Sequence, residues 1–341
     1  MESMETPNAH SWQPDLLGEG YRQHVIELGA DPDGEGSIAA VLVRREPSAR
    51  EVPHGAVLYT HGFSDYFFQT ELADFFAARG LAFYALDLRK SGRALRDGQT
   101  AHYVSDLTLC EKELDIALAI VAGEHPGLPV VMAAHSTGGL IVALWLDHRR
   151  AAGRLAPVSS LVLNSPWFDL QGRPSYRGPL TQALRVLAKA QPLRELKLPS
   201  GLYLQTLHVS GTGEWDFDLA LKPLDGFPVT IGWLNAVRRG HARLHRGLDV
   251  GVPSLVLRST RSHFSREYSP VCDRADLVLD VKQIARWAGC LGSETTVVPI
   301  QDARHDVFLS LPEVREHAYA VLGTWLDSHQ LTRTADKELA D

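Results

Sequence analysis

The chain has 341 residues, of which 45% are hydrophobic and 22% charged, the proportions of an ordinary water-soluble globular protein. The formal net charge is -7, and no run of Lys and Arg is dense enough for a nucleic-acid surface, which excludes nucleic acid as an expected partner. The three cysteines (Cys110, Cys272, Cys290) have no close pair, which argues against a disulfide framework or a zinc site. No apolar window of about 20 residues is present to span a bilayer. Residues 1–15 lack the pattern of a secretory signal, so we expect a cytoplasmic protein.

The chain alternates between segments with strand patterns and segments with helix patterns. Residues 1–20 are expected to form a flexible or loosely docked arm. The expected strands are Gln23–Leu28 and Ile38–Arg45 as an antiparallel hairpin, and then Ala56–Thr60, Leu81–Leu88, Val130–Ala134, Leu161–Asn164, Ser254–Arg258 and Thr295–Val298. The expected helices include Glu71–Arg79, Val104–Ala122, Lys282–Ala288 and a final one preceded by the capping-box residues Ser310–Glu313. This alternation predicts an α/β fold with a mostly parallel sheet flanked by helices.

The alternation is interrupted between residues 169 and 252, a stretch rich in Pro, Gly and aromatic residues. Helical fragments are expected there at Leu180–Ala190 and Trp233–His245. We interpret 169–252 as a lid, or cap, inserted over the carboxyl edge of the sheet. The core domain is then formed by 21–168 together with 253–330, and 331–341 is a polar tail.

The most informative stretch is the transition from strand to helix around Ser136. An apolar strand is followed by His135-Ser136-Thr137-Gly138-Gly139 and then by an apolar helix. This is the layout of a nucleophile elbow, in which a serine on a sharp turn exposes its oxygen next to a helix N-terminus. Ala134 occupies the first position of the usual Gly-x-Ser-x-Gly pattern. The alternative interpretation is a buried strand followed by a helix that has serine as its N-cap.

A serine nucleophile needs a general base, which in turn needs an orienting acid. His305 follows the last expected strand and would lie at the same sheet edge as Ser136. The acid is expected after Ser254–Arg258, where Asp273, Asp276 and Asp280 are candidates, and we favour Asp276. An oxyanion hole needs two N–H groups. Thr137 offers one, and Phe63 offers the second, in the His61-Gly62-Phe63 turn after Ala56–Thr60.

The succession of these motifs resembles the α/β-hydrolase superfamily. The motifs are His61-Gly62, Asp87-x-x-x-x-Gly92, the serine elbow, Asp276-x-x-x-Asp280 and Arg304-His305-Asp306. The chain is most similar to the monoacylglycerol lipase/lysophospholipase-like group, also called serine aminopeptidase-type hydrolases, over roughly Gly55 to Leu326. In that group the first aspartate of the Asp-x-x-x-Asp stretch is the triad acid, which the resemblance assigns to Asp276.

We therefore expect a serine hydrolase that cleaves a carboxylic ester with an apolar acyl or aromatic part, through an acyl-enzyme on Ser136. This chemistry needs no metal and no organic cofactor. The aromatic residues of the lid suggest an apolar pocket, with Trp167, Trp215 and Trp233 as candidate substrate-binding residues. His241 and His245 have the i, i+4 spacing of a zinc helix but lack a third ligand, and we interpret their helix as a solvated lid helix. Two alternatives stay open: a non-catalytic ligand-binding protein of this fold, and another acyl-transfer reaction, such as lactone, thioester or amide opening or a biosynthetic cyclisation.

Overall fold

A computed structural model describes residues 11–47, 52–171, 185–196 and 202–329. The strands are β1 (Gln13–Pro14), β2 (Tyr21–Ala30), β3 (Ser37–Arg45), β4 (Gly55–Thr60), β5 (Leu81–Asp87), β6 (Val130–His135), β7 (Val158–Asn164), β8 (Glu195–Leu196), β9 (Val229–Thr230), β10 (Ser254–Ser259) and β11 (Thr295–Ile300). The α-helices of the described residues include α1 (Thr70–Ala77), α2 (Glu111–Glu124), α3 (Ser136–Ala151), α5 (Leu202–Leu207), α6 (Ile231–Leu244), α7 (Val281–Trp287) and α8 (Pro312–Ser328).

The described residues form a nine-stranded sheet in the order β1-β2-β3-β5-β4-β6-β7-β10-β11 and a separate two-stranded sheet of β8 and β9. The pairings between β1, β2, β3 and β5 are antiparallel, and all those from β5 through β4 to β11 are parallel. The prediction of a mostly parallel sheet with an antiparallel hairpin at its start is therefore confirmed. Because β4, β6, β7, β10 and β11 are parallel, the loops that follow them lie at one edge of the sheet.

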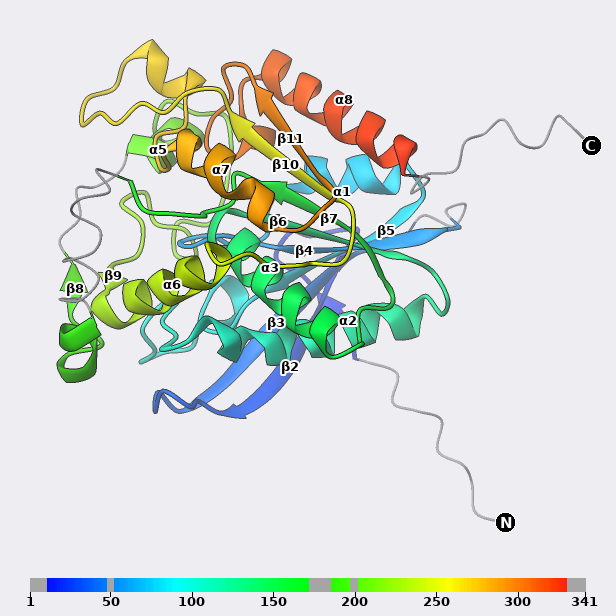
Figure 1. Ribbon diagram of the computed structural model, residues 1–341, viewed down its shortest axis with the longest axis horizontal. Coiled ribbons are helices and arrows are strands. Elements are labelled where there is room, and N and C mark those ends of the chain that lie inside the picture. Colours follow the sequence, from blue (N-terminus) through cyan, green and yellow to red (C-terminus); the bar gives the residue numbers. More distant parts are fainter. Residues whose placement is uncertain (1–10, 48–51, 172–184, 197–201, 330–341) are drawn as a thin grey trace, which may run out of the picture.

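Helices cover both faces of this sheet, with α1 and α8 on one face and α2 and α3 on the other (Figure 1). Strand β4 shows why a continuous apolar run is required in the centre. Its residues Ala56 and Leu58 belong to the apolar cluster that contains α2 and α3. Val57 and Tyr59 point the other way, into the cluster with α1 and α8. Alternate side chains of a strand face opposite sides, so a strand buried on both faces must be apolar throughout.

Two expectations at helix N-termini are wrong. The helix expected from Val104 begins with a 3-10 turn at Leu107–Cys110, where the Asp106 side chain caps the Thr108 N–H, and α2 starts only at Glu111. At α8 the capping box does not form, because Leu311 is the N-cap and no side chain caps it. The hydroxyl of Ser310 instead accepts a hydrogen bond from the Arg304 backbone N–H at 2.9 Å.

Part of the expected N-terminal arm is docked onto the core. Gln13 and Pro14 pair with β2 as a short antiparallel strand. The carboxylate of Asp15 accepts hydrogen bonds from the buried guanidinium of Arg93 at 2.7 and 2.9 Å. Residues 13–15 are therefore docked, and a polar pattern does not reveal the ionic contact because the partner of Asp15 lies 78 residues away.

The insertion between β7 and β10 is partly described. Its residues 185–190 are helical, whereas 180–184 of the expected Leu180–Ala190 fragment lie outside the described residues. Helix α6 packs against α3 through Trp233, Val237 and Leu244, which belong to the same apolar cluster as Leu140 and Leu144. In the described part of the chain, no helix has the length and apolar character needed to cross a membrane.

Candidate active site

Ser136 lies on the sharp turn between β6 and α3, and its backbone has a φ of 51°. Non-glycine residues rarely adopt positive φ, and a nucleophile elbow is one of the places where they do. The next glycines permit the close approach of α3 to the sheet. A Cβ on Gly138 would lie 2.3 Å from the His61 carbonyl oxygen, and one on Gly139 would lie 2.9 Å from the Pro166 Cβ. The small residues after Ser136 are therefore required by the packing.

The structure brings Ser136, His305 and Asp276 together at the carboxyl edge of the sheet. The Nε2 of His305 lies 3.0 Å from the Ser136 Oγ, and its Nδ1 lies 2.9 Å from the Asp276 Oδ2. A carboxylate can only accept, so Nδ1 carries the proton and the Nε2 lone pair accepts from the serine hydroxyl. All three side chains are buried. This is the geometry of a nucleophile, a general base and an orienting acid.

Asp276 is held on both oxygens. Its Oδ1 accepts hydrogen bonds from the backbone N–H groups of Val278 at 2.8 Å and Leu279 at 2.7 Å, which leaves Oδ2 for His305. The other two candidate acids have different partners. Asp273 accepts from Arg304 and Tyr268, and Asp280 caps α7 through the N–H of Lys282.

The loop after β4 lies directly against the elbow. A Cβ on Gly62 would lie 2.9 Å from the Ser136 Cβ. The Nε2 of His61 accepts a hydrogen bond from the Leu88 N–H at 3.1 Å, so its Nδ1 carries the proton and donates to the Gly62 carbonyl at 2.7 Å. In a trans peptide the N–H points opposite to the C=O. His61 therefore fixes the direction of the Phe63 N–H, for which no described residue supplies an acceptor. The Thr137 N–H lies in the first turn of α3, where N–H groups lack intrahelical acceptors.

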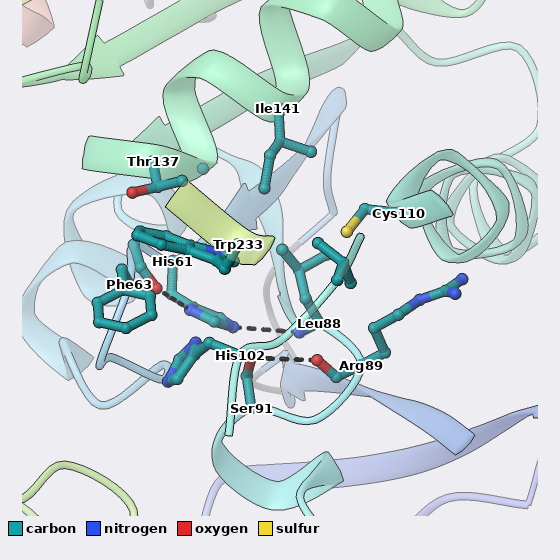
Figure 2. Close-up of a pocket in the computed structure, with 13 residues that line it drawn as sticks. His61, Phe63, Leu88, Arg89, Ser91, His102, Cys110, Thr137, Ile141 and Trp233 are labelled. Atoms are coloured by element: carbon teal, nitrogen blue, oxygen red, sulfur yellow. Dashed lines mark hydrogen bonds between the residues drawn. The ribbon is translucent and has the colours of Figure 1, made fainter. Parts of the chain in front are cut away.

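A small cavity of about 30 Å³ adjoins these two residues. Its wall includes Phe63, Thr137, Ile141, Leu88 and Trp233. Figure 2 shows the Trp233 ring next to Phe63 on one side of the cavity, and the two ring centroids are 4.1 Å apart. A volume of this size holds a water molecule but no acyl chain.

The three candidate tryptophans are placed differently. Trp233 lines the cavity, and Trp167 packs against it with ring centroids 5.7 Å apart. The Trp167 backbone N–H also donates to the Ser136 carbonyl at 3.0 Å. Trp215 does not reach the cavity, because its Nε1–H donates to the Leu309 carbonyl and its ring is covered by Arg315. The Trp215 ring packs instead against a separate apolar cluster that contains Tyr203, Leu207 and Phe217.

The histidine pair on α6 does not form a metal site with a third ligand among the residues described. The Nε2 of His241 contacts the Trp167 carbonyl at 2.9 Å, and that of His245 contacts the Phe168 carbonyl at 2.8 Å. His241 is fully buried, so the expectation of a solvated helix is wrong for this face. Burial lowers the pKa of His241 to about 3, which keeps the ring neutral near pH 7.

Several buried polar residues near the site had no role in the sequence-based reasoning. The ring of Tyr203, on α5 of the insertion, lies edge-on to His305 with centroids 5.5 Å apart, and its hydroxyl accepts from the Asp306 N–H at 3.0 Å. The carboxylate of Asp306 accepts hydrogen bonds from the side chains of Asn164 and Gln69. Arg304-His305-Asp306 was recognised as a motif, but the partners of its outer residues come from distant loops and leave no local signal.

Burial also controls the charge of two neighbouring histidines. It lowers the pKa of His135 to about 4 and that of His102 to about 3, so both rings are neutral near pH 7. The His135 ring lies 4.8 Å from that of His305 and contacts the Asn164 carbonyl through Nδ1. For Asp65, burial alone would raise the pKa, but the charge of Lys222 and nearby groups outweighs it and lowers the pKa to about 2. Lys222 is thus a cation of the insertion paired with the core.

Comparison with known proteins places the fold and the motifs in one family. The family model described as serine aminopeptidase, S33 matches residues 51–267, which is more than half of the chain. The chain belongs to this family. The match includes the elbow with Ser136 and the His61-Gly62 turn, whereas Asp276 and His305 lie beyond its end.

A monoacylglycerol lipase of Mycolicibacterium smegmatis is 33% identical over 115 residues, which make up 33% of this chain and 38% of the relative. The match thus spans well under half the length of that relative. Among solved structures, a soluble variant of the monoglyceride lipase of Saccharomyces cerevisiae aligns with a TM-score of 0.62 at 18% identity, over 98% of this chain and 99% of the other. A thermostable carboxyl esterase of Bacillus coagulans aligns with a TM-score of 0.63 at 15% identity, over 90% and 98%. At these identities the two structures show the α/β-hydrolase fold alone.

Proposed function

We propose that the protein is a serine hydrolase that cleaves a carboxylic ester through an acyl-enzyme on Ser136. The observation that carries the proposal is the buried chain of hydrogen bonds from Ser136 through His305 to Asp276, at 3.0 and 2.9 Å. Groups that are separated by up to 169 residues in the sequence meet there in the order that nucleophilic catalysis requires. Membership of the serine aminopeptidase family and the partial match to a monoacylglycerol lipase support the same chemistry.

In the proposed mechanism, the His305 Nε2 takes the proton of the Ser136 hydroxyl as Oγ attacks the ester carbonyl. Asp276 keeps the imidazole in the required tautomer and stabilises its protonated form. The N–H groups of Phe63 and Thr137 donate to the developing oxyanion. The protonated His305 then gives its proton to the departing alcohol, and a water molecule activated by His305 releases the acid from Ser136. The water proton goes to His305, and the serine regains its hydroxyl hydrogen.

For the substrate, we propose an ester with an apolar acyl or aromatic part, with monoacylglycerols as the first class to test. Aromatic residues surround the approach to Ser136, since Trp233, Trp167 and Phe63 pack against one another. The cavity of about 30 Å³ admits no acyl chain as it stands. We therefore propose that residues 169–252 act as a lid and that Trp233 on α6 moves aside when substrate binds.

The test compares the wild type with Ser136→Ala. A panel of p-nitrophenyl esters of increasing chain length, together with monoacylglycerols, measures turnover, and a fluorophosphonate probe measures whether the serine is nucleophilic. We expect ester turnover and labelling in the wild type and neither in Ser136→Ala. Ligand binding without turnover or labelling would instead support a non-catalytic protein of this fold, and labelling without turnover of any ester would favour another acyl-transfer reaction.

A further inference from the structure

A buried arginine lies next to His305 in the sequence, and its side chain reaches toward the segment of Asp276. Arg304 is 2% exposed. Its Nη2 donates to the Asp273 Oδ1 at 2.8 Å, and its Nη1 donates to the Leu309 carbonyl at 2.9 Å. Its backbone N–H donates to the Ser310 hydroxyl. The guanidinium therefore joins the loop that carries His305 to the 3-10 turn at Pro270–Arg274, which ends two residues before Asp276.

The backbone of Asp276 is held on the side of β10, where its N–H donates to the Arg261 carbonyl at 3.0 Å and its carbonyl accepts from the His263 N–H at 2.9 Å, whereas the 3-10 turn before it faces the His305 loop. The segment before Asp276 is a long connection from β10, and its Phe264, Tyr268 and Val271 have large apolar or aromatic side chains that are exposed. A second ionic link to the His305 loop exists, because Asp302 accepts from Arg261 and Arg274. Both of those arginine side chains are more than one-third exposed, and exposed ion pairs contribute little to the stability of a fold. The buried Arg304–Asp273 pair is thus the stronger of the two links.

We propose that Arg304 and Asp273 are positioning residues that set the distance between His305 and Asp276. The inference rests on the proposed function, in which these two side chains work as base and acid. The planar fork of arginine binds two acceptors in fixed directions, so it constrains the Asp273 turn and the Leu309 carbonyl at once. The second oxygen of Asp273 accepts a hydrogen bond from the exposed Tyr268 hydroxyl at 2.7 Å, so Arg304 is the buried partner of this carboxylate. A rotation of the turn would move Asp276 away from the His305 Nδ1.

The experiment uses the whole 341-residue chain and, as a control, a variant at another buried arginine. Arg304→Met and Asp273→Asn remove the clamp from either end, and Arg304→Lys keeps the charge but lacks the fork. The control is Arg93→Met, whose guanidinium is also buried and is paired with both Asp15 and Asp87, none of which contacts Ser136, His305 or Asp276. Two quantities are measured after folding is checked by circular dichroism: kcat and KM on an ester that the wild type cleaves, and the downfield proton resonance of the His305 Nδ1–H. That resonance is read without substrate and is assigned by its absence in His305→Ala.

We expect kcat to fall about 10- to 100-fold in Arg304→Met and Asp273→Asn with little change in KM, because a shift of about 1 Å in a reacting group has an effect of this size. The resonance is expected to move upfield or broaden in both. Arg304→Lys should resemble Arg304→Met, and the double variant Arg304→Met/Asp273→Asn should lose little more than the worse single variant, since the two residues act as one unit.

Three results would overturn the proposal. One is that Asp273→Asn keeps the kcat and the His305 resonance of the wild type. Asp273→Asn is the milder variant, so it decides the test if Arg304→Met does not fold. Another is that Arg304→Lys behaves as the wild type, which would assign the effect to charge alone. The third is that Arg93→Met shifts the resonance equally. If the wild type cleaves no ester, the proposed function fails, and the resonance still reports whether the clamp holds His305 against Asp276.

Discussion

Replacing Gly138 by alanine tests whether the contact between the elbow and the β4 loop sets the oxyanion hole. The added Cβ would lie 2.3 Å from the His61 carbonyl oxygen and 2.9 Å from that of Thr60, whereas ordinary contacts begin at 3.4 Å. Both atoms belong to the backbone, so no side-chain rotation relieves the clash. The His61 carbonyl or the start of α3 must move by about 1 Å. The first movement displaces the peptide that carries the Phe63 N–H, and the second displaces Ser136 and Thr137.

A displacement of about 1 Å in a catalytic group lowers the rate by roughly 100-fold, and overpacking a dense site destabilises the fold by about 1–3 kcal/mol. We therefore expect Gly138→Ala to show a kcat about 100-fold below the wild type on a p-nitrophenyl ester, with a smaller change in KM and a lower Tm. The matched control is Gly123→Ala, on an exposed site of α2 where a Cβ meets nothing within 4 Å. It should keep kcat and gain up to about 1 kcal/mol from helix propensity. A folded Gly138→Ala protein with wild-type kcat would refute the reasoning.

Three further predictions concern the acid, the buried histidines and the cavity. Asp276→Asn should lower kcat by about 10⁴-fold, while Asp280→Asn, a change between two good N-cap residues, should leave it nearly unchanged; equal losses would contradict the assignment. The folded-state pKa of His241 is lowered from 6.5 to about 3 by burial, so between these values only the unfolded state takes up the proton and stability falls as the pH falls. Urea unfolding between about pH 4 and 6.5 gives the free energy of unfolding as a function of pH, and its slope should be flatter in His241→Gln than in the wild type by up to about 1.4 kcal/mol per pH unit. Parallel curves for the two proteins would count against this prediction. Trp233→Ala should favour longer acyl chains in the ester panel. Trp215→Ala, at a partly buried residue, should lower stability by less than the roughly 3–5 kcal/mol lost at a fully buried tryptophan and leave the preference unchanged; the same shift in preference in both variants would argue against a role specific to Trp233.

The core of the fold could be predicted because hydrophobic patterns report burial directly. The apolar runs at β4, β5 and β6 can be buried on both faces only in the middle of a parallel sheet. Parallel strands also end at one edge of the sheet, so the sequence alone predicts that Ser136 and His305 lie close together. Asp273, Asp276 and Asp280 all follow the same strand, so their position alone does not decide between them. The resemblance to the monoacylglycerol lipase-like group is what assigns the role of acid to Asp276.

The parts that could not be predicted depend on contacts between distant loops. Ser310 has the sequence of a helix cap, yet its hydroxyl accepts from the Arg304 N–H, because the loop after β11 folds back onto the start of α8. Tyr203 on α5 meets His305 through a ring contact between segments about 100 residues apart, which no local pattern reveals. Trp215 and Trp233 are both tryptophans of the same aromatic-rich stretch, yet Trp215 packs against a different apolar cluster. A periodic pattern states that a side chain is buried, and it carries no information on which neighbour it meets.

The buried arginine beside His305 illustrates this difference in a way that bears on function. Taking a guanidinium and a carboxylate out of water costs several kcal/mol, and apolar residues of similar size often stabilise a fold as well or better. The Arg304–Asp273 pair is therefore a poor device for stability alone. What it supplies is direction, since a planar fork held by a carboxylate and a carbonyl fixes two loops relative to each other. Those loops carry His305 and Asp276, whose hydrogen bond of 2.9 Å tolerates little displacement. An ionic clamp at this place is thus better explained by the geometry that the proposed proton transfer from Ser136 would demand than by the stability of the fold.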